Sequence, residues 1–276
     1  MLTRILVAVI FVPILFYIML ACPPVVWTLV VALIAGVAAF EFLRAMEVRQ
    51  QWLQIGVVTA ATAIPLLCWF HREVAHIPTH YVLPVMVSLV CVVFWGAICS
   101  YGREDELSVA QLMSCFFCGI MVPLGLSALV ELKCMNRGEY LVLLAVLLTF
   151  VTDAAAYFVG VFFGKHRGIT KVSPNKSLEG YVGGFLFGTL FAVVYGLVLQ
   201  EMAGIAVRYP ALALCGLCGA GVTELGDLAF SYIKRKQGIK DFGTLLPGHG
   251  GMMDRFDSMT FCGPVIYCLA VYLSVF

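Results

Sequence analysis

The sequence predicts an all-α integral membrane protein, a polytopic bundle of about nine transmembrane helices. Composition is the first reason: 62% of the 276 residues are hydrophobic and 12% are charged, whereas soluble domains contain about 25% charged residues. The second reason is that apolar runs long enough to cross a bilayer recur along the whole chain. The third is physical, because lipid offers backbone amides no partner and a spanning segment must satisfy them internally, as a helix does.

The expected spans are separated by polar or proline-containing breaks. They cover residues 3–22, 25–46, 53–70, 82–100, 108–130, 139–163, 180–200, 205–233 and 256–275. The first span is similar to a secretory signal, because Arg4 precedes an apolar run that ends at Cys22. We expect it to be retained as a helix, since the run can cross a membrane by itself and another span follows at once.

The distribution of basic residues predicts the orientation of these spans. With the N-terminus in the cytoplasm and sides alternating, most of the 17 Lys and Arg residues fall in cytoplasmic segments, as the positive-inside rule requires. The opposite side then holds Arg72, Lys133, Arg137 and Arg208. Two cytoplasmic loops, 164–179 and 234–255, contain most of the cations, and we expect function to reside there.

We divide the chain into N-terminal transmembrane helices, residues 1–130, and a catalytic transmembrane region, residues 131–276, that carries both loops. The 11 cysteines lie mostly within apolar runs, so we expect them to pack as small apolar side chains rather than to form disulfides. Two Cys-x-x-Cys pairs, which begin at Cys115 and Cys215, have the spacing of zinc or redox sites. Neither pair has further candidate ligands nearby.

Acidic residues near the C-terminus are the candidate metal ligands. Glu224 and Asp227 are three residues apart and Ser231 is four further on, so all three share one face of the eighth span. Asp254 and Asp257 are again three apart, at the start of the last span. Magnesium takes one or two protein carboxylates and completes its shell with water and substrate phosphate oxygens. The sequence therefore predicts that Asp227, Asp254, Asp257 and Glu224 hold a metal, with Asp227 and Asp254 sharing one ion.

Basic side chains and a glycine-rich turn accompany these acids. The turn 247–251 lets backbone amides approach an anion closely. Carboxylates, cations and exposed amides are the groups that phosphoryl and nucleotidyl transfer use for positioning and charge neutralisation. The candidate catalytic residues are Lys234, Arg235, Lys240, Asp241, His249 and Arg255. A phosphate nucleophile is already anionic, so His249 is not required as a base.

The loop 164–179 provides candidate substrate-binding residues. It follows Asp153 and Tyr157, which share one face of the sixth span, and Glu179 opens the next helix. An ordinary basic cytoplasmic loop explains this segment equally well. With three residues from the C-terminal region, the candidate substrate-binding set is Ser173, Lys176, Ser177, Glu179, Ser231, Gly250 and Gly251.

Each of these residues has a simpler explanation when taken alone. Basic residues at a membrane boundary are usually anchors, and an acid at a helix start is usually a cap. The set as a whole favours a functional explanation, because acids inside a membrane are costly and are normally retained for a function.

These residues together resemble the phosphatidate cytidylyltransferase family, the CDP-diacylglycerol synthases. The family pattern of Ser, Lys-Arg, Lys-Asp, Pro-Gly-His-Gly-Gly, Asp-Arg and Asp is matched from Ser231 to Asp257. The segment from Asp153 to Gly180 is also similar, except that Asn175 stands where lysine is common and Ser177 where threonine is common. The similarity covers residues 150–260, whereas the earlier spans match only in being hydrophobic.

The resemblance implies that CTP and phosphatidate are the substrates, and that CDP-diacylglycerol, a phospholipid precursor, and pyrophosphate are the products. It implies magnesium as cofactor, leaves room for a second cation, and suggests a homodimer. We expect membrane lipids but no nucleic acid as partners. The expected location is a bacterial cytoplasmic (inner) membrane, with the active site facing the cytoplasm.

Two other functions are compatible with these residues. A CTP-dependent lipid-alcohol kinase would use similar groups but transfer the γ-phosphate. A non-enzymatic ion or proton transporter is suggested by Glu224 and Asp227 within a span. Transporters usually carry such acids at the membrane midplane between repeated halves, and neither feature is visible in this sequence.

Overall fold

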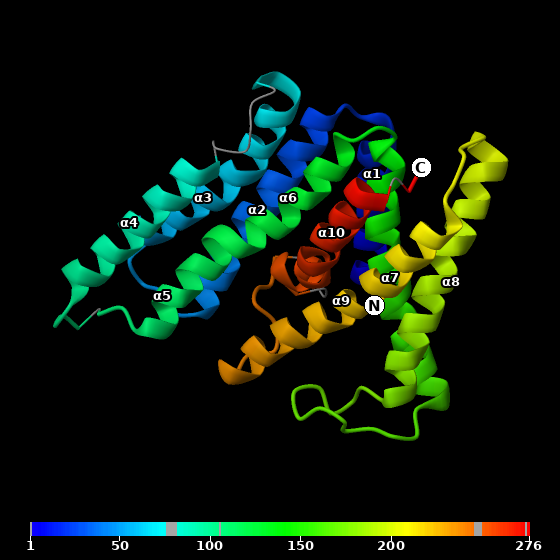
Figure 1. Ribbon diagram of the computed structural model, residues 1–276. Coiled ribbons are helices and arrows are strands. Elements are labelled where there is room, and N and C mark those ends of the chain that lie inside the picture. The colour runs from blue at the N-terminus through cyan, green and yellow to red at the C-terminus, as the bar shows by residue number, and fades with distance from the viewer. Residues whose placement is uncertain (1, 76–81, 105, 246–249, 274) are drawn as a thin grey trace. The chain divides into compact units, whose positions relative to one another are not determined.

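A computed structural model describes residues 2–75, 82–104, 106–245, 250–273 and 275–276, and its elements are all helices (Figure 1). In chain order the α-helices are α1 Leu2–Ala21, α2 Pro24–Ala45, α3 Gln51–Phe70, α4 Val82–Ser100, α5 Val109–Phe116, α6 Val122–Lys133, α7 Gly138–Phe163, α8 Leu178–Ala203, α9 Tyr209–Lys236 and α10 Met253–Leu273. Two π-helical turns, η1 His71–Ala75 and η2 Phe117–Met121, extend α3 and join α5 to α6.

Eight helical stretches within the described residues are long and apolar enough to cross a membrane. They correspond to the expected spans from the second onward, with α5, η2 and α6 forming the single stretch Val109–Lys133. The first expected span forms α1, whose described apolar stretch runs from Val12 to Ala21. The prediction of an all-α multispan membrane protein is therefore confirmed.

The chain divides into two compact units, each built from two segments of sequence. Unit 1 contains Met1–Met135 and Gln237–Phe256, and unit 2 contains Asn136–Lys236 and Asp257–Phe276. The glycine-rich C-terminal loop thus belongs to the same unit as the N-terminal helices. The start of α10 belongs to unit 1, and the rest of that helix belongs to unit 2.

In unit 1, α2 packs against α3 and α6. The fully buried Trp27 of α2 donates its indole N–H to the carbonyl of Leu129 at 3.1 Å, which joins α2 to α6. Phe42, near the end of α2, contacts Phe117 of η2 and also stacks on Phe242 of the C-terminal loop, with ring centroids 5.2 Å apart in the second pair. Aromatic pairs of this kind add to the stability gained from burial. They fix the C-terminal loop against α2.

In unit 2, α8 packs against both α7 and α9, which also contact each other; Figure 1 shows the three helices. Close approach requires glycine on α8: a Cβ added at Gly188 would lie 2.7 Å from Thr152 Oγ1 and 2.9 Å from the Cβ of Ala220. Small residues allow membrane helices to come this close. Tyr195 of α8 also donates its hydroxyl to the carbonyl of Tyr140 of α7 at 2.8 Å.

Candidate active site

Acidic side chains and one lysine gather in unit 2; we call these five residues the acidic cluster. Its members are Asp153 on α7, Lys176 in the loop before α8, Glu224 and Asp227 on α9, and Asp257 on α10. Asp153 interacts electrostatically with Asp227, Asp257 and Lys176. Glu224 interacts in the same way with Lys176, Asp153 and Asp227. Three helices and one loop thus bring together most of the charged residues of unit 2 that the sequence analysis selected.

Lys176 and Asp227 form an ion pair at the centre of the acidic cluster. The Lys176 ammonium also lies over the Tyr181 ring, 5.3 Å from its centroid. Burial, the largest single effect, lowers the pKa of Lys176, but the charge and hydrogen bond of Asp227, together with Tyr181 and Asp153, hold that pKa above its usual value. Both side chains remain partly exposed, at 27% and 30%. A charged lysine is therefore held where a ligand can reach it.

Glu224 brings an unsatisfied oxygen into the acidic cluster. The residue is 4% exposed, and its Oε1 atom is buried without a hydrogen-bond partner among the described residues. The hydroxyls of Thr152 and Thr223 are buried and unpartnered in the same sense. An unpaired buried polar group is costly, and carboxylate oxygens are preferred ligands of hard cations. The donor chemistry of the acidic cluster thus fits magnesium.

Two predicted substrate-binding residues of unit 2 have well-defined local roles. Ser177 is 1% exposed and caps α8, because its Oγ accepts the Gly180 N–H at 3.1 Å. Glu179 accepts backbone N–H groups of Lys165 and His166 and contacts His166 Nδ1 at 2.6 Å. Both residues hold the loop against the start of α8, and so help to place Lys176.

The described residues of the C-terminal segment of unit 1, 241–245 and 250–253, which we call the glycine loop, are fastened by Asp254. One carboxylate oxygen of Asp254 accepts the N–H groups of Phe242 at 2.8 Å and Gly251 at 3.0 Å. Gly250 has a φ of +83°, where a side chain would be strained. A Cβ there would also lie 3.2 Å from the carboxylates of both Asp241 and Asp254. The loop therefore brings two acids and backbone amides close together.

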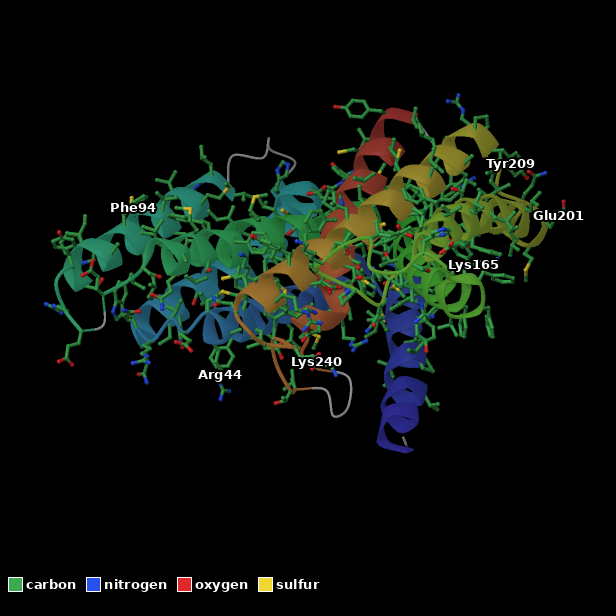
Figure 2. The ribbon with its side chains drawn as sticks, turned by 90° about the horizontal axis from the view of Figure 1, so that it is seen from below. Arg44, Phe94, Lys165, Glu201, Tyr209 and Lys240 are labelled. Atoms are coloured by element: carbon green, nitrogen blue, oxygen red, sulfur yellow. The ribbon has the colours of Figure 1, made fainter. Side chains whose placement is uncertain are left out.

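Most of the remaining predicted residues lie near the ends of α9 and α10 or next to the glycine loop, and Ser173 lies in the loop before α8. Arg235, Lys240, Asp241 and Arg255 are exposed, whereas Ser173, Ser231 and Lys234 are half-buried. Figure 2 shows Arg44 and Lys240 at the surface of unit 1. His249 lies outside the described residues.

The predicted metal ligands are divided between the units: Asp254 lies in unit 1, and Glu224, Asp227 and Asp257 lie in unit 2. No group of three His, Cys, Asp or Glu residues in the described parts of the chain is arranged as a ready-made metal site. The sharing of one ion by Asp227 and Asp254 therefore stays a prediction.

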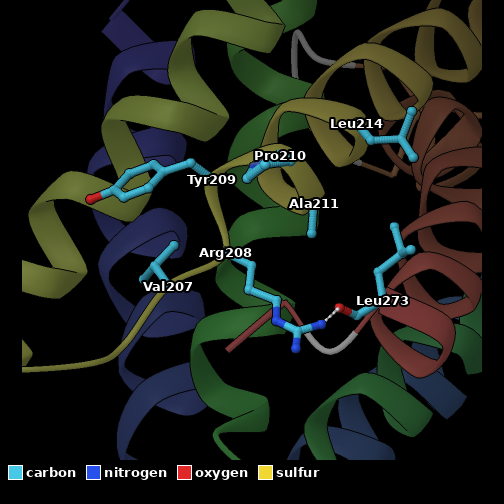
Figure 3. Close-up of a pocket in the computed structure, with 7 residues that line it drawn as sticks. All are labelled: Val207, Arg208, Tyr209, Pro210, Ala211, Leu214 and Leu273. Carbon is cyan, nitrogen blue, oxygen red and sulfur yellow. Dashed lines mark hydrogen bonds between the residues drawn. The ribbon is translucent and has the colours of Figure 1, made fainter.

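Two cavities lie in different parts of the molecule. In unit 1, an open pocket of about 560 Å³ lies between the end of α2 and the glycine loop, with Glu41, Arg44 and Asp241 in its wall. In unit 2, a mostly apolar cavity of about 490 Å³ lies around Tyr209 and Leu273 (Figure 3). The second cavity is at the start of α9, about 27 Å of helix from Asp227 at ~1.5 Å per residue, so we assign it no part in the site.

Sequence reasoning missed Glu41 and Tyr181 and did not place Asp153 in the site. Glu41 lies in α2, far from the selected loops, yet it contacts the glycine loop. The sequence signal that could have identified Glu41 is an acid within an apolar span. Only the acids of α9 were interpreted in that way.

The chain is similar to proteins whose activity is named. A family model described as "Cytidylyltransferase family" matches residues 2–273. Proteins named phosphatidate cytidylyltransferase are 42% identical over 123 residues in Bacillus subtilis, 35% over 161 in Thermotoga maritima and 29% over 242 in Staphylococcus saprophyticus. The matches cover 45%, 58% and 87% of this chain. The chain spans about half the length of the first two relatives, 44% and 56%, and 88% of the third.

Proposed function

The chain belongs to the cytidylyltransferase family, and from this we propose that it is a phosphatidate cytidylyltransferase, which makes CDP-diacylglycerol and pyrophosphate from CTP and phosphatidate. The acidic cluster is the observation that supports the proposal most directly. Four acids lie around one lysine in this cluster: Asp153, Glu224, Asp227 and Asp257. Acids within a membrane protein are energetically costly, and this cost favours a functional role for them.

The reaction needs charge neutralisation more than acid–base chemistry. An oxygen of the lipid phosphate attacks the α-phosphorus of CTP in line; the new P–O bond forms as the bond to the β-phosphate oxygen breaks, and pyrophosphate leaves with that electron pair. The nucleophile is already anionic, so no proton has to be removed. Positioned cations and backbone amides lower the barrier by stabilising the charge on the transferred and leaving phosphates.

The residues of this chain supply that stabilisation in two ways. Lys176, held by Asp227 and Tyr181, presents a fixed positive charge within the acidic cluster. Basic side chains at the ends of α9 and α10 and in the segment between them would neutralise the pyrophosphate; these are Lys234, Arg235, Lys240 and Arg255. The amide of Gly250 would approach an anion, because glycine leaves the backbone uncovered there, whereas the Gly251 N–H is already donated to Asp254.

Magnesium would supply further charge neutralisation to the bound phosphates. Its proposed ligands are Asp227 and Asp254, with Asp257 and Glu224 as additional carboxylates, and a second cation is compatible with so many acids. The unpartnered Oε1 of Glu224 supports a cation in unit 2.

The depth of the site suits a lipid headgroup. Asp227 precedes Lys234 by seven residues on α9, about 10 Å of helix at ~1.5 Å per residue. It therefore lies just inside the boundary that the basic residues mark, where the phosphate of a membrane lipid is found. We also propose that this face is cytoplasmic, in a bacterial inner membrane, and that the protein is a homodimer.

Labelled CTP tests the proposal. Purified protein is incubated with phosphatidate vesicles, magnesium and CTP labelled in either the α- or the γ-phosphate, and the lipid is extracted. The proposal predicts α-label in the lipid and γ-label in pyrophosphate. Label from the γ-phosphate in the lipid would instead indicate a lipid kinase. Proton flux across liposomes in the absence of nucleotide, without labelled lipid, would indicate a transporter.

A further inference from the structure

A buried carboxylate in the N-terminal helices contacts the C-terminal glycine loop. Glu41 is near the end of α2 and is 7% exposed, next to the almost fully buried Phe42 and Leu43. Acids in such surroundings are rare because the charge loses its water without a matching gain, and they normally mark a function. Neither the acidic cluster nor the proposed reaction uses Glu41.

One oxygen of Glu41 holds the start of α10. Its Oε2 accepts the backbone N–H of Met253, 212 residues along the chain, at 3.0 Å, and the backbone of Met252 also hydrogen-bonds to this carboxylate. The first N–H groups of a helix have no partner within the helix, and a negative charge there is favourable. Glu41 therefore caps α10 from another helix, directly before Asp254.

The same carboxylate is enclosed by two glycines of the loop. A Cβ at Gly243 would lie 2.3 Å from Glu41 Oε1, and a Cβ at Gly251 would lie 2.4 Å from Oε2. Only glycine permits contacts this close at either position. Glu41 thus contacts both described parts of the loop, and Phe242 of the loop also stacks on Phe42 of α2.

The second carboxylate oxygen of Glu41, Oε1, has different surroundings from Oε2. Oε1 is buried without a hydrogen-bond partner among the described residues, an arrangement that costs stability. An apolar side chain would fill this space without that cost. What the carboxylate adds is its hold on the backbone N–H groups at the start of α10.

We propose that Glu41 is a positioning residue for cytidylyl transfer: it fixes the glycine loop and the start of α10, so that the Asp254 carboxylate is held in place for a metal and the Gly250 amide for phosphate. This inference rests on the proposed function, and it gives the N-terminal helix α2 a positioning role in the reaction. Glu41 itself touches backbone and not substrate.

Kinetics of two variants test this role. Glu41→Ala removes the acceptor, and Glu41→Gln keeps an oxygen but loses the charge. We expect kcat to fall about 10- to 100-fold in the alanine variant, as for other residues that orient a ligand-binding group, and less in the glutamine variant. The KM for CTP should change little. Glu131→Gln is the control, because it breaks the Arg72–Glu131 ion pair of unit 1 away from the loop and should lower Tm without lowering kcat.

A double variant separates positioning from general stability. In the wild type, Gly243→Ala forces a Cβ against Glu41 and should reduce kcat. In the Glu41→Ala background the same change should cause no further loss, because the clashing carboxylate is gone and both changes act through one contact. Fully additive losses would overturn the proposal, as would kcat values for both Glu41 variants equal to that of Glu131→Gln.

Hydrogen exchange provides a measurement that does not depend on turnover. The amides of Gly251 and Met253 should exchange faster in Glu41→Gln than in Glu131→Gln, and unchanged protection would count against the role of Glu41. If the wild type forms no CDP-diacylglycerol, the proposed function fails. If the wild type is active but the Glu41 variants leave the exchange rates and kcat unchanged, only the positioning role fails.

Discussion

Lys176 and Asp227 form an ion pair that joins the loop before α8 to the cytoplasmic end expected for α9. The two residues are 51 positions apart in the sequence, and the pair places a permanent positive charge among four carboxylates. This arrangement can bind either a phosphate, through the lysine, or a cation, through the acids. A nucleotidyl transfer reaction requires both.

Asp227 should be essential for catalysis and dispensable for insertion. Asp227→Asn removes the charge at nearly constant size, and we expect CTP-dependent product formation to fall by about 100-fold or more, the order found when a charge-stabilising group is lost. Membrane insertion and Tm are measured alongside. Glu201→Gln, an exposed change at the far end of α8 (Figure 2), is the matched control. Turnover like that of the wild type would remove the metal assignment of Asp227.

Asp254 should be equally important, for two reasons. Asp254→Asn loses a proposed metal ligand and also weakens two charge-assisted hydrogen bonds, to Phe242 and Gly251. We expect a comparable loss of turnover together with faster protease cleavage of the glycine loop. If the variant keeps both its activity and its resistance to protease, neither role of Asp254 is supported.

Lys176 should act through charge and position together. Lys176→Met leaves the partly buried Asp227 carboxylate without this ion-pair partner, so we expect a large loss of activity and a lower Tm, since removing one partner leaves the other charge uncompensated. Lys176→Arg keeps the charge but not the geometry and should recover part of the activity. Equal activity of the two variants would mean that the charge at this position is unimportant.

Gly184 should tolerate no side chain. A Cβ there would lie 2.1 Å from Glu224 Oε1, so Gly184→Ala must displace the Glu224 carboxylate or separate α8 from α9. We expect reduced activity and a lower Tm. Gly56→Ala is the control in another helix, because its Cβ would meet only ordinary contact at 3.5 Å. A harmless Gly184→Ala would show that the position of Glu224 does not matter.

Lys240 and Cys215 should rank in opposite order. Lys240 is exposed and lies beside the glycine loop. We expect Lys240→Ala to impair turnover severely, because the leaving pyrophosphate loses a positive charge that would neutralise it. Cys215 is fully buried on α9 as a free thiol, and Cys215→Ser should leave kcat nearly unchanged. The reverse order, measured with the same labelled CTP, would place the reaction elsewhere.

The helices could be predicted from sequence because a long apolar run in a membrane satisfies its backbone hydrogen bonds by forming a helix. The residues of the site could be selected because charges in such runs stand out. The contacts that these residues make could not be predicted, because no sequence periodicity relates Lys176 to Asp227 or Glu41 to Met253. The roles of Ser177 and Glu179 in capping and closing the loop also depend on backbone geometry that residue types alone do not determine.

A double-mutant cycle in metal binding tests most directly whether Asp227 and Asp254 serve one ion. Mn²⁺, which can replace Mg²⁺ and is seen by electron paramagnetic resonance, is titrated in the presence of CTP into the wild type, Asp227→Asn, Asp254→Asn and the double variant. If both carboxylates bind the same ion, each single change weakens binding severely and the double variant loses little more. Independent, additive losses, or unchanged affinity in either single variant, would contradict a shared metal centre.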